Sequence, residues 1–261
     1  MHTIESLIDK INNAKELDFG TILSESIELF KKTWLQGFLL QLFTVIIMLP
    51  LIIVLYIPLI GIFIAQADGG YSSPSDFNAF FAGMSIFYIL FVIVGVFVLG
   101  AISVALNAAF FRIMKMLDHN EQVTTSDFFY FIKTKYLSKI FVLMLASIGI
   151  AILAALLCYL PIFYVMVPLS YFSVFYAFNP ELSVGEIVKA SFKIGTKKWL
   201  ISFGLILVAS LMAQLVGFLL CFIGLLFTAT FVYHPIYIIY KIVIGFEEVS
   251  EIESIGISSS E

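Results

Sequence analysis

Residues 35–64 read LQGFLLQLFTVIIMLPLIIVLYIPLIGIFI, and this uncharged stretch decides the class of fold. A helix needs about 20 apolar residues to cross the roughly 30 Å hydrocarbon core of a bilayer. The stretch therefore predicts a membrane-spanning helix that is too long for an upright span. We expect it to tilt strongly, to kink at Pro50 and Pro58, or to project past the bilayer.

Comparable apolar stretches recur along the chain. One further span is predicted in Phe80–Phe111, two in Ile140–Phe178 with a break near Cys158, and two in Leu200–Tyr240 with a break near Cys221. None of them alternates polar and apolar residues as barrel strands do, so the spans are expected to be helices. The predicted fold class is all-α, a polytopic membrane protein with six transmembrane helices.

The composition excludes several classes of protein. The 261 residues are 61% apolar and 12% charged, with a mean hydropathy of +1.08; an ordinary soluble domain is about 45–50% apolar and about 25% charged. This excludes a soluble enzyme, a disordered chain and a disulfide-stapled secreted module. A net charge of −4 with 14 basic residues also excludes a nucleic-acid partner.

The positions of the basic residues predict the orientation. With six spans, all of them fall on one side of the membrane: Lys10, Lys15, Lys31, Lys32, Arg112, Lys115, Lys133, Lys135, Lys139, Lys189, Lys193, Lys197, Lys198 and Lys241. The opposite side receives the loop 65–78 and two tight turns without charge. The positive-inside rule then places both termini in the cytoplasm. No cleavable signal peptide is expected, because the first 30 residues are charged and amphipathic.

Self-comparison predicts a threefold internal repeat. Residues 17–40 match residues 182–205 at nine of 24 positions, and residues 129–158 match residues 192–221 at eight of 30. We therefore divide the chain into an amphipathic N-terminal segment (1–16), repeat one with a long hairpin (17–116), repeat two (117–178), repeat three (179–244) and an acidic disordered cytoplasmic tail (245–261).

Each repeat is expected to begin with a short amphipathic helix followed by a transmembrane hairpin. In repeat three, Ser183 and Glu186 have the spacing of a helix-capping box. Such helices suit the membrane surface, with their apolar side in the acyl boundary and their lysines toward the headgroups. Trp34, Tyr136 and Trp199 stand where helix and span meet, so we predict that they are interfacial anchors.

These motifs carry a resemblance. The Leu-x-x-Gly-x-Ile starts at Leu17 and Leu182, the Thr-Ser-Asp-Phe-Phe run of 125–129 and the Lys-x-Trp-Leu entries resemble an uncharacterised bacterial six-helix integral membrane family, related to the membrane domain attached to some glycerophosphodiester phosphodiesterases. The resemblance covers nearly the whole chain and implies a place in the bacterial inner membrane, but it carries no catalytic residue with it, and residues 1–261 include no segment that resembles the soluble phosphodiesterase domain. Chains of this appearance are sometimes labelled carotenoid oxygenases, a label that the small number of histidines in this chain does not support.

The spans offer few groups for chemistry. His234 is the one histidine within a predicted span, and one histidine cannot build an iron or zinc site, so we predict no cofactor and no catalytic residue. Asn107, Gln214 and His234 have two interpretations: they hydrogen-bond between packed helices, or they line a pathway for a neutral or amphipathic solute. Cys158 and Cys221 fall in equivalent outer turns, where they either form a disulfide or stay reduced.

Three functions were weighed. A non-enzymatic protein that organises or senses the bilayer, interacts with lipids or serves as a complex subunit needs no polar constellation, and we favour it. A transporter or channel for a neutral or lipid-like solute is the alternative, and an intramembrane enzyme would need a clustered nucleophile and base. Membrane lipids are the expected partners; the sequence leaves protein partners and homo-oligomers undetermined.

Overall fold

The computed structural model describes residues 3–67, 86–157 and 160–246, and within these ranges the chain forms helices and no strand. Six helical segments are long and apolar enough to cross a membrane, as the sequence predicts. They are Phe19–Pro58, Tyr88–Asp118, Lys135–Leu156, Pro161–Phe178, Trp199–Leu219 and Leu225–Val243. The all-α, multi-pass architecture is confirmed.

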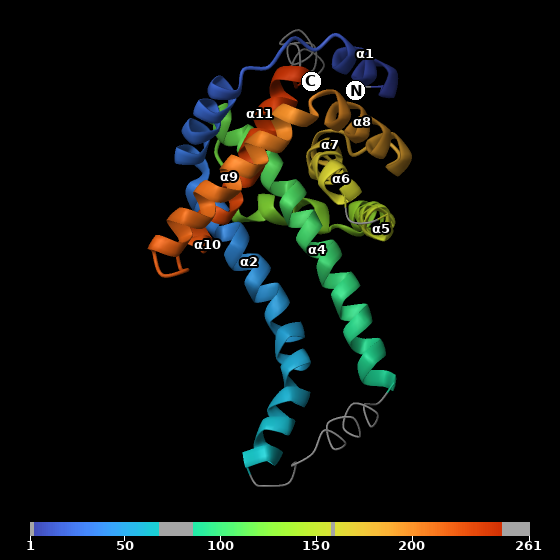
Figure 1. The fold of residues 1–261 in the computed structure, drawn as a ribbon, viewed down its shortest axis with the longest axis vertical. Helices are drawn as coiled ribbons and strands as arrows, with labels where there is room; N and C mark the ends of the chain where they lie inside the picture. Colours follow the sequence, from blue (N-terminus) through green and yellow to red (C-terminus); the bar gives the residue numbers. More distant parts are fainter. Residues whose placement is uncertain (1–2, 68–85, 158–159, 247–261) are drawn as a thin grey trace, which may run out of the picture.

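The first hairpin is much longer than the others. Helix α2 (Phe19–Ala67) has 49 residues and contains Pro50 and Pro58, and it pairs with α4 (Ile86–Asp118). At about 1.5 Å per residue, α2 is roughly 70 Å long. Figure 1 shows the hairpin projecting well beyond the remaining helices. The hairpin thus extends beyond the other spans, and how its excess length is accommodated in the bilayer stays a prediction.

Two shorter hairpins complete the molecule. One consists of α5 (Thr134–Leu156), α6 (Leu160–Ser170) and α7 (Phe172–Phe178). The other consists of α9 (Trp199–Leu219), α10 (Leu225–Thr228), the 3₁₀ turn η2 (Ala229–Val232) and α11 (Tyr233–Val243). In Figure 1, α5 is seen nearly end-on while α9 leans away from the long hairpin, so the hairpins splay apart.

The core lies where the second arms of the three hairpins meet. The end of α4, α7 and α11 contact one another there. Their largest fully buried side chains are aromatic: Phe110, Phe111, Phe175, Tyr176, Tyr237 and Tyr240. Asn179, directly after α7, donates from Nδ2 to the Tyr240 hydroxyl at 2.7 Å. The second arms of the two shorter hairpins are therefore more buried than their first arms: 50% and 56% of the most apolar windows of Pro161–Phe178 and Leu225–Val243 are buried, against 22% and 28% for Lys135–Leu156 and Trp199–Leu219.

Helix α8 (Val184–Lys197) begins with the predicted capping box. The Glu186 carboxylate accepts from the Ser183 backbone N–H at 2.8 Å, and the Glu186 N–H donates to the Ser183 hydroxyl at 3.3 Å. The centre of the apolar face, at Ile187, Ser191 and Ile194, is fully buried, and Val184, Val188 and Phe192 at its edges are half-buried. It packs on α6 and α7, and α1 (Ile4–Asn12) covers it from the other side. The expectation that this face lies among lipid acyl chains is wrong, because the protein itself covers it.

The starts of the other predicted repeats take different forms. In repeat one, the Asp18 carboxylate accepts from the Thr21 N–H at 2.7 Å, and α2 then continues through Trp34 without a break. In repeat two, the short helix is the 3₁₀ helix η1 (Thr125–Ile132), capped by the Asp127 carboxylate, which accepts from the Thr124 N–H. All three begin at a side-chain cap, but their helices differ, and the threefold repeat stays a prediction.

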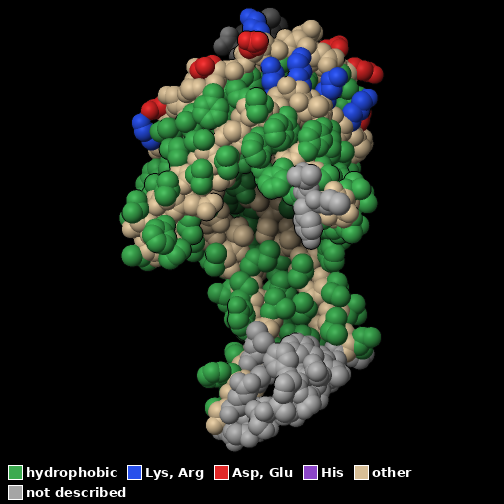
Figure 2. Space-filling view, viewed as in Figure 1, with side chains coloured by type: hydrophobic (Ala, Val, Ile, Leu, Met, Phe, Trp, Pro, Cys, Tyr) green, Lys and Arg blue, Asp and Glu red, His purple; other side chains and the backbone are tan. Residues whose placement is uncertain are grey.

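Several lysines at the charged end of the molecule hold chain ends together. Lys197 donates to the Asn12 carbonyl and Lys198 to the Lys15 carbonyl, just after α1, and Lys10 donates to the Ile244 carbonyl at 2.7 Å. Burial, helped by the neighbouring charge of Lys197, lowers the pKa of Lys198. In Figure 2 the charged side chains gather around α1 and α8, whereas the described part of the long hairpin shows an apolar surface. Charge is thus segregated along the long axis.

Candidate binding site for an anionic headgroup

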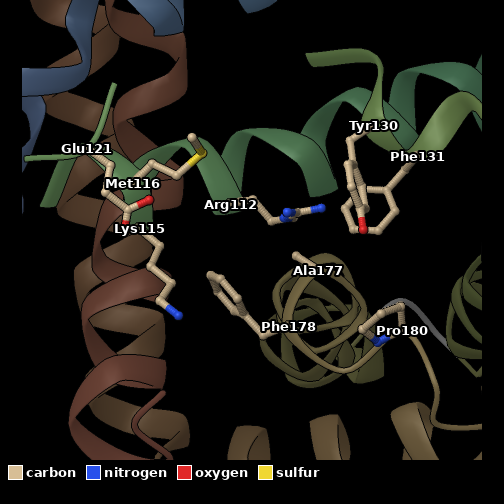
Figure 3. A pocket seen from close by; sticks show the side chains of 9 residues that line it. All are labelled: Arg112, Lys115, Met116, Glu121, Tyr130, Phe131, Ala177, Phe178 and Pro180. Carbon is tan, nitrogen blue, oxygen red and sulfur yellow. The ribbon is translucent and has the colours of Figure 1, made fainter. Parts of the chain in front are cut away.

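A pocket of about 330 Å³ lies between the end of α4, η1 and the end of α7. Figure 3 shows its lining, which we call the basic pocket: Arg112, Lys115, Met116, Glu121, Tyr130, Phe131, Ala177, Phe178 and Pro180. It combines two cations and one carboxylate with aromatic and aliphatic walls. Its volume is at the lower end of the roughly 300–1,000 Å³ that is typical of ligand pockets.

Helix α4 places the two cations on one face. Arg112 and Lys115 are three residues apart, and residues at that spacing are neighbours on a helix surface. The intervening Ile113 and Met114 are fully buried in the core. Since the core fixes the rotation of α4, both basic residues line the pocket; in Figure 3, Arg112 extends toward Tyr130 and Lys115 extends away from it, past Phe178.

The wall opposite α4 comes from η1. The Arg112 guanidinium carbon lies 3.5 Å from the centre of the Tyr130 ring and 5.7 Å from that of Phe131. Phe131 is fully buried and packs against Tyr176 of α7. The stacked ring restricts the orientation of the guanidinium while leaving its N–H edge available.

Lys115 lies on the other side of the pocket. Its Nζ is 4.7 Å from the centre of the Phe246 ring, and Phe246 in turn packs against Phe178 at 4.7 Å between ring centres. Phe246 is among the first residues of the predicted tail, so the tail begins as part of the packed structure. The remainder, 247–261, lies outside the described residues.

The electrostatics of the pocket favour an anion. Hydrogen bonds with Tyr136 and Arg112, together with the nearby charges of Arg112 and Lys133, lower the pKa of Tyr130. Glu121 is the one carboxylate among the nine lining residues. The lining contains no Ser, Thr, Cys or His side chain. The pocket is therefore built to bind a negatively charged group through Arg and Lys donors.

A second cavity faces the apolar region. About 290 Å³ lies between α2 and α4, lined only by apolar residues: Pro50, Leu51, Val54, Phe91, Val94, Gly95, Val98 and Leu99. We call it the apolar groove. Its lining suits a hydrocarbon chain, because it offers contacts without any polar group to satisfy.

The three predicted interfacial anchors occupy different surroundings. Trp34 is 45% exposed and lies 6.2 Å from Phe227 between ring centres. Tyr136 stacks on Tyr130 at the back of the basic pocket. Trp199 donates from Nε1 to the Tyr164 carbonyl at 3.1 Å. Only Tyr136 is thus near the basic pocket, and the anchoring role of all three stays a prediction.

The three polar residues that could line a pathway differ in their exposure to solvent. His234 is fully buried between Thr33 and Thr230, Asn107 is half-buried on α4, and Gln214 is exposed on α9. None of them lines the basic pocket or the apolar groove. The structure therefore gives His234 a packing environment.

The cysteines and metal ligands add no further site. Cys221 is exposed, and its expected disulfide partner, Cys158, lies outside the described residues. Among the residues that the structure describes, no group of three or more His, Cys, Asp and Glu side chains is arranged to hold a metal ion.

Sequence reasoning treated Arg112 and Lys115 only as markers of topology. A signal was present, since two basic residues three apart end a span and precede the aromatic run Phe128–Phe131. The sequence did not predict that η1 and α7 pack beside the end of α4, and this packing forms the pocket around the basic residues.

Comparison with protein-family models, curated proteins and solved structures finds no match to this chain. The resemblance to the membrane domain of some glycerophosphodiester phosphodiesterases stays a prediction.

Proposed function

We propose that this chain is a multi-pass protein of the bacterial inner membrane, with both termini in the cytoplasm, that binds and organises membrane lipids without enzymatic turnover. The observation that carries the proposal is the long hairpin. In the most apolar 18-residue windows of α2 and α4, only 11% and 17% of the residues are buried inside the protein. A surface this apolar needs lipid or another apolar partner to cover it.

The apolar groove supports lipid contact at a defined place. Pro50 and Gly95 lie on its facing walls, and the Leu51 side chain approaches the position that a Cβ on Gly95 would take to 2.9 Å. The bulk of Pro50 and the missing side chain of Gly95 shape the surface between the two helices. An acyl chain lying in the groove would cover apolar surface that the hairpin leaves open.

Because the apolar face of α8 is buried, α8 is not the part of the protein that we propose to contact lipid acyl chains. A helix that inserts as a wedge into the inner leaflet needs a free apolar face, and the face of α8 packs on the protein. The proposal therefore relies on the sides of the spans and on the hairpin surfaces. Transport, the alternative, would need a wet path through Asn107, Gln214 and His234, and no described observation favours it.

Lipid retention tests the proposal. The protein is extracted in a mild detergent, and bound phospholipid is counted by native mass spectrometry. We expect retained phospholipid on the unaltered chain and a reduced number on Val98→Trp, which fills the apolar groove. Val142→Trp on α5 is the matched control, because Val98 and Val142 are 47% and 50% exposed and only Val98 lines the groove. If the unaltered chain retains no phospholipid, the proposal fails.

A further inference from the structure

We infer that the basic pocket binds the phosphodiester of an anionic phospholipid, an inference that rests on the proposed lipid function and names the class of lipid. The starting observation is that Arg112 and Lys115, one turn apart on α4, both line one cavity, with Arg112 extending toward Tyr130 and Lys115 passing on the other side of Phe178 (Figure 3). A phosphate oxygen pair matches the parallel N–H donors of a guanidinium, and an ammonium adds a second point charge.

Neither cation is neutralised by a carboxylate among the described residues. Arg112 hydrogen-bonds to the Tyr130 side chain and lies over its ring, and the Lys115 Nζ faces the Phe246 ring, but the described ion pairs involve neither of them. Nearby basic residues behave differently: Lys139 donates to the Pro180 carbonyl, and Lys241 pairs with Asp118 at 2.6 Å. A half-buried arginine has five N–H donors, more than the Tyr130 hydroxyl can satisfy, and an external anion would supply the further acceptors.

The walls explain why the ligand is a lipid. Met116, Phe131, Ala177, Phe178 and Pro180 surround the cations with apolar surface. Free phosphate would leave this surface without a partner, whereas the glycerol and upper acyl carbons of a phospholipid would cover it. The volume of about 330 Å³ holds a headgroup but not the acyl chains, so the chains must leave along the spans.

The position along α4 fits a headgroup. Arg112 is the first charged residue of α4, which begins at Ile86, and α4 ends six residues later at Asp118. A cation at the end of an apolar span lies at the depth of lipid phosphates. The site is thus placed where a phospholipid presents its charge.

The charge of Glu121 provides a second test, because its removal should change anion affinity in the opposite direction to the removal of Arg112 and Lys115. The Glu121 carboxylate lines the pocket and opposes an anion there, and Lys133, near Tyr130, adds to the favourable charge. Removing the Glu121 charge should strengthen binding, whereas removing Arg112 and Lys115 should weaken it. Opposite effects from neighbouring residues would not arise from a general loss of structure.

The experiment measures binding to delipidated protein in a neutral detergent. Short-chain phosphatidylglycerol, short-chain phosphatidylcholine and inorganic phosphate are titrated separately. We expect phosphatidylglycerol to bind more tightly than the other two. The double variant Arg112→Gln with Lys115→Gln should lose at least tenfold in affinity for phosphatidylglycerol, Arg112→Lys should lose part of it, and Glu121→Gln should gain. The matched control is Lys189→Gln with Lys193→Gln, two exposed lysines on α8.

The outcomes separate the two proposals. If the unaltered chain retains lipid but the Arg112/Lys115 double variant binds phosphatidylglycerol as well as the control does, the pocket assignment is wrong and the lipid function stands. Equal affinity for inorganic phosphate and phosphatidylglycerol would assign the cations to a soluble phosphate and overturn the lipid assignment. If the double variant does not fold, a loss of affinity in Arg112→Lys together with a gain in Glu121→Gln supports the assignment, and the absence of both refutes it.

Discussion

Thr33 and His234 lie 201 residues apart in the chain, yet the Thr33 hydroxyl oxygen and the His234 Nε2 are 2.7 Å apart inside the protein. Both residues are fully buried. The His234 Nδ1 faces the Thr230 carbonyl at 3.2 Å, and since a carbonyl only accepts, Nδ1 carries the proton in a neutral ring. The single proton of the Thr33 hydroxyl is then shared between Nε2 and the Leu29 carbonyl of its own helix, 3.1 Å away, and the contact with Nε2 joins α2 to α11.

Replacing Thr33 by Val should therefore destabilise the protein. The change keeps the shape of the side chain but leaves Nε2 without a donor, at an expected cost of about 1–2 kcal/mol. The measurement is an unfolding titration with a denaturing detergent. Thr44→Val is the control, because the Thr44 hydroxyl bonds only within its own helix, to Leu40. Equal stability of the two variants would show that the Thr33–His234 contact contributes little.

Substitution of Gly195 tests the packing of α8 on α6. A Cβ built on Gly195 would lie 2.7 Å from the backbone Cα of Pro168, which cannot move without shifting α6. Gly195→Ala should cost about 1–3 kcal/mol through overpacking. Gly185→Ala, in the same helix with nothing within 4 Å of the added Cβ, should stabilise by up to about 1 kcal/mol. Thermal unfolding of both variants would reveal the opposite signs, and a stabilised Gly195→Ala would contradict the close approach.

The Ser183–Glu186 capping box predicts a pH dependence. Hydrogen bonds from the Ser183 hydroxyl and backbone N–H lower the pKa of Glu186 in the folded state. A carboxyl group with a lowered pKa stabilises the fold above its unfolded value, about 4.3, and this stabilisation is lost as the pH falls through the folded value. Glu186→Gln should therefore lower the melting temperature at neutral pH, with the difference from the unaltered chain closing in acid. A difference that is constant across pH would rule out this origin.

Labelling of single cysteines tests the proposed orientation. A membrane-impermeant maleimide applied to intact cells should modify Cys221 but not a cysteine placed at Lys193, which should react only after the inner membrane is permeabilised. The variants need Cys158→Ser throughout, with Cys221→Ser added to Lys193→Cys, so that each carries one thiol. Labelling of position 193 in intact cells would contradict the proposed topology, because all basic residues are assigned to the cytoplasmic side.

The sequence by itself determined the helical, six-span architecture. Apolar runs such as 35–64 are too long and too uncharged for any other fold, and hydrophobic length needs no tertiary information to be recognised. The caps at Asp18, Thr124 and Ser183 were also readable, because capping depends on residues three apart in the chain.

Only the tertiary structure decided what each face contacts. The periodicity of α8 showed that Ile187 and Ser191 share a face, but it is equally consistent with cover by lipid and cover by protein, and the structure buries that face against α6 and α7. The basic pocket likewise requires α4, η1 and α7 to meet, which brings Arg112 to Tyr130 and Phe178 to Phe246. Such contacts depend on chain paths that return from distant positions, and local sequence patterns do not encode them.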